Sequence, residues 1–164
     1  MKALDLAAAK QKAYRLLALR PHSEKELKKK LRDKGFSEAV IKEALEKLHD
    51  LKYLNDASFA VQWARNLAVN KLWGNRKISA GLQEKGVAQQ LIEDAIASVR
   101  QELSESDAVA KLIRKKTAGK KMAAPDRKEK QRIFTSLMGR GFPPGLILNQ
   151  LGKSVEEEID DDDR

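Results

Sequence analysis

A six-residue pattern occurs three times in this chain of 164 residues. It reads LRDKGF at 31–36, LQEKGV at 82–87 and LMGRGF at 137–142. Each copy has a leucine, two variable residues, a lysine or arginine, a glycine and an apolar residue. Apolar positions on both sides recur with it, so that seven positions keep their character in every copy: Leu27, Leu31, Lys34, Gly35, Phe36, Ile41 and Leu45; Ile78, Leu82, Lys85, Gly86, Val87, Ile92 and Ile96; Ile133, Leu137, Arg140, Gly141, Phe142, Ile147 and Leu151. This repetition, at a spacing of about 50 residues, predicts repeated supersecondary units.

The residues of the first copy predict two helices joined by a tight turn. Apolar residues four positions apart lie on one face of a helix, both before and after the glycine. Ser23 and Glu26 form a capping box that starts the first of these helices near residue 24. Gly35 is suited to the left-handed conformation in which a helix ends, and Ser37 is suited to cap the next helix. Phe36 is then the apolar residue that closes the turn against the core.

Each copy is preceded by a further helical segment. These segments cover 6–20, 56–72 with Asp56 as the N-cap and Gly74 after the end, and 107–117, entered through Ser104 and Ser106. The predicted fold is therefore all-α, with three tandem three-helix repeats that resemble helix-turn-helix units. We place the repeats at 1–54, 55–102 and 103–152, and an acidic disordered tail at 153–164.

The charge of the chain is unevenly distributed. The net charge is +9, but the segment 156–164 contains seven acidic residues and one arginine, a net of −6. The first 155 residues therefore carry +9 + 6 = +15. A body this basic suggests a polyanionic partner, with nucleic acid as the leading candidate. A lysine-rich solubilising surface is the alternative, and charge alone does not separate the two.

Several functional classes find no support in the sequence. Cysteine is absent, and the two histidines lack companions that could complete a metal site. The Gly-Lys-Ser at 152–154 fails the phosphate-loop spacing because Ile147 stands where the first glycine belongs, and Pro144 breaks the dinucleotide pattern in GRGFPPG. No apolar run approaches the roughly 20 residues that span a bilayer. We expect a soluble cytoplasmic protein that is not an enzyme and uses no cofactor or metal.

Basic side chains are therefore the candidate binding residues. In the first repeat nearby glutamates favour an ordinary solvated surface, whereas in 111–132 only Asp126 and Glu129 offset many positive groups. Trp63 and Trp73 could stack on bases, but tryptophans at helical spacing among Ala and Leu favour a place in the core. The candidate contact residues are Lys28, Lys29, Arg32, Arg76, Lys77, Arg114, Lys115, Lys116, Lys120, Lys121, Arg127 and Lys128.

Four blocks of the chain resemble the RecX family of recombinase regulators. They are SEKELKKKLRDKGF, YLNDASFA, GNRKISAGLQEKGV and LMGRGFPPGLI, and their order and spacing extend the resemblance over about residues 10–151. Two features depart from the family pattern. Pro143-Pro144 begins the last helix, where proline is compatible with a first turn. The acidic tail is the second departure.

The resemblance implies a function without catalysis. Members of this family bind the RecA recombinase and its filament on single-stranded DNA. They restrain filament extension, ATP hydrolysis, strand exchange and the coprotease activity of the SOS response, and so affect homologous recombination and DNA repair. The resemblance implies an elongated, curved monomer that lies on the filament, with direct contact to single-stranded DNA weak and supplementary. An autonomous DNA-binding protein of the helix-turn-helix kind and a helical scaffold for another protein are the alternatives. No helix carries a cluster of Arg, Asn and Gln suited to reading base edges.

Overall fold

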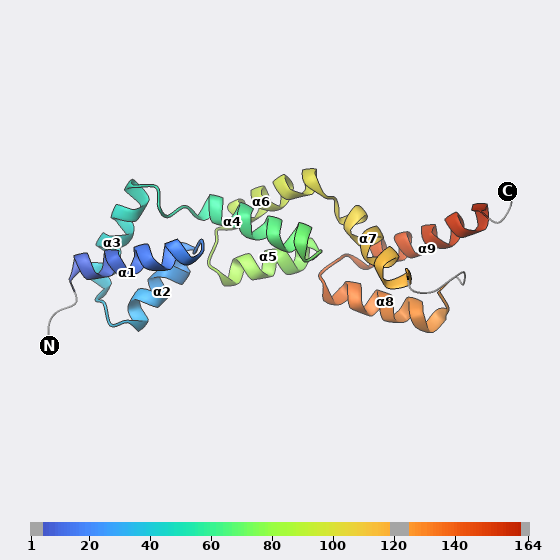
Figure 1. The fold of residues 1–164 in the computed structure, drawn as a ribbon, viewed down its shortest axis with the longest axis horizontal. Coiled ribbons are helices and arrows are strands. Elements are labelled where there is room, and N and C mark those ends of the chain that lie inside the picture. Colours follow the sequence, from blue (N-terminus) through green and yellow to red (C-terminus); the bar gives the residue numbers. More distant parts are fainter. Residues whose placement is uncertain (1–4, 119–124, 162–164) are drawn as a thin grey trace. The chain divides into compact units, whose positions relative to one another are not determined.

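The computed structural model describes residues 5–118 and 125–161, and within these ranges it contains helices and no strand (Figure 1). The all-α prediction is thus confirmed. None of the helices in the described ranges has the length and hydropathy that a bilayer-spanning helix requires. The elements are α1 (Leu6–Leu19), α2 (Glu24–Asp33), α3 (Glu38–Asp50), α4 (Asp56–Arg65), a π-helix (Asn66–Asn70), α5 (Asn75–Glu84), α6 (Gln89–Glu102), α7 (Glu105–Thr117), α8 (Arg127–Gly139) and α9 (Pro144–Asp161).

The repeated glycines end helices, as predicted. Gly35, Gly86 and Gly141 have φ values of +91°, +76° and +89°, the left-handed region that glycine adopts without steric cost. The apolar residue after each glycine is buried, and Phe142 is only 1% exposed. Ser23 forms the predicted capping box with Glu26. The Lys/Arg-Gly-apolar pattern is therefore a helix stop followed by a core residue.

The structure differs from the sequence prediction at two places in the second repeat. Asn55, and not Asp56, caps α4, since the Asn55 side chain accepts a hydrogen bond from the Ser58 N–H at 3.1 Å. The predicted single helix 56–72 is interrupted: α4 stops at Arg65, and the backbone continues as a π-helix in which the Lys71 N–H donates to the Asn66 carbonyl. A π-helix inserts one residue into a helical turn, and periodicity alone does not reveal where this occurs.

The C-terminal helix extends further than the sequence suggested. α9 continues through Gly152 to Asp161, so its backbone is helical over most of the segment that we predicted to be a disordered tail. Glutamate is a good helix former, and a helix that has already been nucleated extends at little cost. Residues 162–164 lie outside the described ranges.

The chain divides into two compact units. Unit 1 contains residues 1–63 and 81–95, and unit 2 contains residues 64–80 and 96–164. Helices α4, α5 and α6 each contribute residues to both units. The first three helices thus belong to unit 1 and the last three to unit 2.

Each unit has its own apolar core. In unit 1, residues from α1, α2 and α3 form one cluster, in which Leu27, Leu31 and Ile41 are fully buried. In unit 2, residues from α7, α8 and α9 form the second cluster around Leu137 and Ile147. Burial of a leucine or isoleucine stabilises the folded state by about 1.5–3 kcal/mol, so these repeated positions hold each helix triplet together.

The middle helix of one repeat is capped by residues of the next repeat. In unit 1, the Asp56 carboxylate accepts the Glu24 N–H at 2.8 Å, and the Ser23 hydroxyl donates to the Lys85 carbonyl at 2.7 Å. Burial raises the pKa of Asp56, and the hydrogen bond from Glu24 opposes this effect. Asp56 therefore caps α2 rather than its own helix.

Unit 2 repeats the same arrangement. The Glu105 carboxylate accepts the Asn75 N–H at 3.1 Å, and the Arg140 carbonyl accepts the Gly74 N–H at 2.7 Å. The Gly141 carbonyl also accepts the Arg76 N–H at 3.3 Å. The first N–H groups of a helix have no partner within the helix, and in both units a carboxylate of the following repeat accepts one of them. The following glycine turn also accepts hydrogen bonds, from the Ser23 hydroxyl in unit 1 and from the Gly74 and Arg76 N–H groups in unit 2.

Glu26 makes the contact between α2 and Lys85 of the second repeat dependent on pH. Burial alone would raise the pKa of Glu26, but hydrogen bonds from Arg20, the Ser23 N–H and Lys85 lower it to about 2 from the usual 4.5. The ionised carboxylate therefore stabilises the fold above pH 4.5, and this contribution is lost as the pH falls from 4.5 towards 2.

We predict that Glu26→Gln lowers the free energy of unfolding at pH 7 by roughly 1–2 kcal/mol, a range reduced for the solvent screening of partly exposed partners. Urea unfolding at pH 7 and pH 3 measures this effect, and the difference between variant and wild type should be smaller at pH 3. Glu43→Gln is the matched control, because Glu43 forms only an exposed ion pair with Lys47 at 3.9 Å. Equal effects of the two substitutions would contradict the prediction.

Candidate functional site

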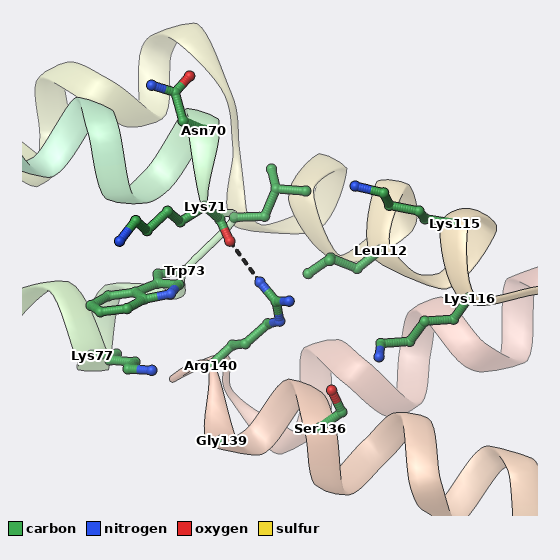
Figure 2. Close-up of a pocket in the computed structure, with 11 residues that line it drawn as sticks. Asn70, Lys71, Trp73, Lys77, Leu112, Lys115, Lys116, Ser136, Gly139 and Arg140 are labelled. Atoms are coloured by element: carbon green, nitrogen blue, oxygen red, sulfur yellow. Dashed lines mark hydrogen bonds between the residues drawn. The ribbon is translucent and has the colours of Figure 1, made fainter.

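A basic groove of about 760 Å³ lies in unit 2 (Figure 2). Its walls come from the segment after the π-helix, the start of α5, the second half of α7 and the end of α8. We call it the Trp73 groove. The residues that line it are Asn70, Lys71, Leu72, Trp73, Lys77, Leu112, Lys115, Lys116, Ser136, Gly139 and Arg140.

All charged side chains that line the groove are positive. Five of its side chains are cationic, and no carboxylate is among the residues that line it. In the described part of the chain, these five form no ion pair. Like charges gathered in a concavity focus a positive potential, so the Trp73 groove is suited to an anionic ligand.

Trp73 lies against two of these cations. The ammonium group of Lys77 is 3.9 Å from the Trp73 ring centroid, and that of Lys71 is 5.8 Å away. Figure 2 shows the ring between the two lysines. Both distances lie within the range of cation–π attraction, so the ring helps to hold both ammonium groups at the groove.

The backbone that carries Trp73 is irregular. The π-helix ends at Asn70, and Leu72 follows with a φ of +54°, an unusual conformation for a bulky residue. The Trp73 N–H nevertheless donates to the Leu67 carbonyl at 2.9 Å, which closes the helix end. Strained backbone of this kind often occurs at binding sites, because surrounding contacts are needed to maintain it.

Hydrogen bonds from the Arg100 side chain fix the same segment. Its guanidinium donates to the Trp73 carbonyl at 2.9 Å, to the Asn75 side chain at 2.7 Å and to the Leu103 carbonyl at 3.2 Å. Burial lowers the pKa of Arg100, and the Glu105 carboxylate opposes this shift. Arg100 therefore acts as a structural clamp on the segment that carries Trp73.

The structure brings together only part of the predicted contact set. Lys77, Lys115 and Lys116 line the Trp73 groove. Arg76, Arg114, Arg127 and Lys128 are exposed in unit 2 but do not line it. Lys120 and Lys121 lie outside the described residues. The polar groove residues that we did not select from the sequence are Asn70, Lys71, Ser136 and Arg140.

The predicted contact residues of the first repeat lie beside carboxylates on the surface. Arg32 pairs with Glu38 at 2.6 Å, and Lys28 lies 3.9 Å from the same carboxylate. The Arg32 guanidinium lowers the pKa of Glu38. Lys29 is exposed near both acidic and basic side chains. This surface is electrically mixed, which favours the solvated-surface interpretation for α2.

The two tryptophans lie in different surroundings. Trp63 and Trp73 are both half-buried, and neither belongs to a described core cluster. A β-carbon at Gly81 would overlap the Trp63 ring, so that ring packs directly on the α5 backbone within unit 1. Trp73 instead faces the groove. Spacing among Ala and Leu does not distinguish a core tryptophan from one at a groove.

The histidines have structural contacts. His22 is 3% exposed, and its Nδ1–H donates to the Arg20 carbonyl at 2.9 Å while its Nε2 accepts from Lys30 at 3.0 Å. Burial lowers the pKa of His22, in keeping with a neutral ring. His49 lies 3.4 Å from Glu24 at the surface. In the ranges 5–118 and 125–161, no group of three or more metal-ligating side chains occurs.

Comparison with protein families gives a match for every repeat. The models for the first, second and third three-helix domains of RecX match residues 9–48, 55–96 and 104–149. A regulatory protein RecX of Pelodictyon phaeoclathratiforme is 37% identical over 155 residues, which cover 92% of this chain and 91% of that protein. One from Chlorobaculum tepidum is also 37% identical, covering 93% of this chain and 91% of the relative.

A solved structure has the same fold. The crystal structure of RecX from Lactobacillus salivarius superimposes with a TM-score of 0.78, covering 91% of this chain and 96% of that chain at 24% identity. The repeated three-helix architecture predicted from the sequence is therefore confirmed.

Proposed function

The chain belongs to the RecX family, and from this premise we propose that it regulates the RecA recombinase by binding the protein and its filament on single-stranded DNA. Binding inhibits filament extension and, with it, ATP hydrolysis, strand exchange and the coprotease activity of the SOS response. The protein acts as a monomer in the cytoplasm and contributes no catalytic step. The observation that carries the proposal is the match of all three repeats, at 37% identity to a regulatory protein RecX over nearly the whole chain.

The Trp73 groove supports this proposal by its charge. A nucleoprotein filament presents phosphates and acidic side chains, and five cations without a facing carboxylate complement such a surface. Lys77, Lys115 and Lys116 are therefore the candidate contacts that we favour among the predicted set. Lys120 and Lys121 stay in the set on the strength of sequence charge alone.

ATP hydrolysis by RecA on single-stranded DNA tests the proposal. We predict that the wild-type protein inhibits hydrolysis at substoichiometric ratios, because one bound molecule blocks extension of a whole filament. The triple variant Lys77→Glu/Lys115→Glu/Lys116→Glu should require at least about tenfold more protein, since charge reversal in the groove repels an anionic surface.

A matched variant distinguishes the effect of the groove residues from the effect of a change in net charge. Arg15→Glu/Lys42→Glu/Lys111→Glu makes the same change of charge at exposed positions outside the groove and should inhibit like the wild type. If equimolar wild-type protein has no effect on hydrolysis, the proposed function is wrong. A sequence-specific footprint on duplex DNA without the recombinase would instead support an autonomous DNA-binding protein.

A further inference from the structure

We propose that the Trp73 groove binds the phosphodiester backbone of an unpaired nucleic-acid strand, without reading its bases. The inference rests on the proposed function only for the source of the strand, which the filament supplies. The binding chemistry follows from the groove itself. It assigns a ligand class to Lys71, Lys77, Lys115, Lys116 and Arg140 together.

The donors of the groove match phosphate oxygens. Ammonium and guanidinium groups are cationic donors without an acceptor atom, so they suit an acceptor-only ligand such as a phosphodiester. The Ser136 hydroxyl adds a neutral donor on the same wall. Arg140 is held in place by its hydrogen bond to the Lys71 carbonyl at 2.6 Å, and its remaining N–H groups are available to a phosphate.

Trp73 serves this site by holding lysines rather than by stacking on a base. The Lys77 ammonium group lies 3.9 Å from the ring centroid, and that of Lys71 lies 5.8 Å away on the other side of the ring in Figure 2, so both are within cation–π range. A stacked base would have to displace one of these ammonium groups and lose its attraction to the ring. We therefore expect affinity to follow the number of phosphates and not the identity or presence of bases.

The shape of the groove favours a single strand. Its lining comes from four separate chain segments and surrounds a volume of about 760 Å³, which is small compared with a turn of duplex DNA. Duplex DNA is stiff, with a persistence length of about 50 nm, and does not deform to enter a hollow of this size, whereas an unpaired strand can. The groove should therefore bind single strands more tightly than duplexes of equal length.

Fluorescence anisotropy without recombinase tests this inference. The probes are a labelled 15-nucleotide oligothymidine, an abasic strand of the same length and a duplex of the same length. We expect the abasic strand to bind within about twofold of oligothymidine, and the duplex to bind more weakly than either. Lys77→Gln/Lys115→Gln/Lys116→Gln should weaken single-strand binding about tenfold or more at low salt and reduce the salt slope by about 2, because each lost phosphate contact contributes about 0.7.

Two further variants test the role of Trp73. Trp73→Leu keeps apolar bulk but removes the cation–π contacts and should weaken binding several-fold, whereas Trp73→Phe retains an aromatic face and should restore most of it. Arg15→Gln/Lys42→Gln/Lys111→Gln is the charge control and should leave the groove intact.

Three outcomes would overturn the inference. The first is oligothymidine binding more than tenfold tighter than the abasic strand, which would show that bases stack. The second is an unchanged affinity and salt slope in the lysine-to-glutamine variant. The third is equal competition by an acidic peptide of matched charge, which would assign the groove to acidic proteins. Strand binding without inhibition of recombinase ATPase would refute only the proposed function. Inhibition of the ATPase without strand binding would refute only this inference.

Discussion

Gly74→Ala is expected to lower the free energy of unfolding by roughly 3–5 kcal/mol. A β-carbon at this position would overlap the carbonyl group of Gly141 and the backbone nitrogen of Phe142, and backbone atoms cannot rotate away as a side chain can. Overpacking of this kind costs about 1–3 kcal/mol. Moving the two segments apart would also break the hydrogen bonds from Gly74 to Arg140 and from Arg76 to Gly141, each contributing about 1 kcal/mol.

Urea unfolding followed by circular dichroism and by Trp73 emission, in a Trp63→Phe background, measures the change in unit 2. Gly145→Ala is the control, because a β-carbon there meets nothing within 4 Å and alanine favours the α9 helix by up to about 1 kcal/mol. If Gly74→Ala unfolded at the same urea concentration as the control, the close approach of the two backbones would be disproved.

Arg100→Met is expected to cost about 2–4 kcal/mol and to shift the emission of Trp73. The substitution keeps an aliphatic stem but leaves the Trp73 carbonyl, the Leu103 carbonyl and the Asn75 side-chain oxygen without their donor. Half-buried acceptors that lose a partner cost about 1–3 kcal/mol each when water cannot replace the donor fully.

The control is Arg65→Met in the same unit. Arg65 pairs with Glu102 at 2.7 Å, but the two side chains are 56% and 44% exposed. An exposed ion pair of this kind contributes less than about 1 kcal/mol. Thermal and urea unfolding of both variants should separate them clearly, and equal losses would argue against Arg100 as a clamp of the Trp73 segment.

Local backbone chemistry explains why much of the fold was predictable. Gly35, Gly86 and Gly141 end helices for a reason that depends only on φ, and Ser23 caps α2 with a residue three positions away. The residues that form a helix stop or a cap lie within a few positions of one another, so these features can be recognised in the sequence alone. Because the pattern occurs three times, it predicts three pairs of helices that are each joined by a glycine turn.

The groove was less predictable because its parts are distant in sequence. The Lys71 carbonyl and the Arg140 guanidinium are 69 positions apart, and no local pattern links them. The density of cations in 111–132 pointed to the right segment, yet helical geometry sends Arg114 away from the groove while Lys115 and Lys116 line it. The π-helix before Trp73 leaves no signal in hydrophobic periodicity, so the orientation of that ring required the structure.

The capping of one repeat by the next has a consequence for synthesis of the chain. Translation delivers α2 before Asp56 and long before Lys85, whose carbonyl is 62 positions after Ser23. The Glu24 N–H and the Ser23 hydroxyl therefore leave the ribosome before their acceptors in the second repeat have been made, although the capping box of α2 is already complete. In the same way, the Asn75 and Gly74 N–H groups at the start of α5 are synthesised before their acceptors on Glu105 and Arg140. Caps within one repeat need no later segment, and examples are Ser23 on α2 and Asp126 on α8, which accepts the Glu129 N–H at 2.8 Å. Each of the first two repeats can thus complete its junction contacts only after the next repeat has been synthesised.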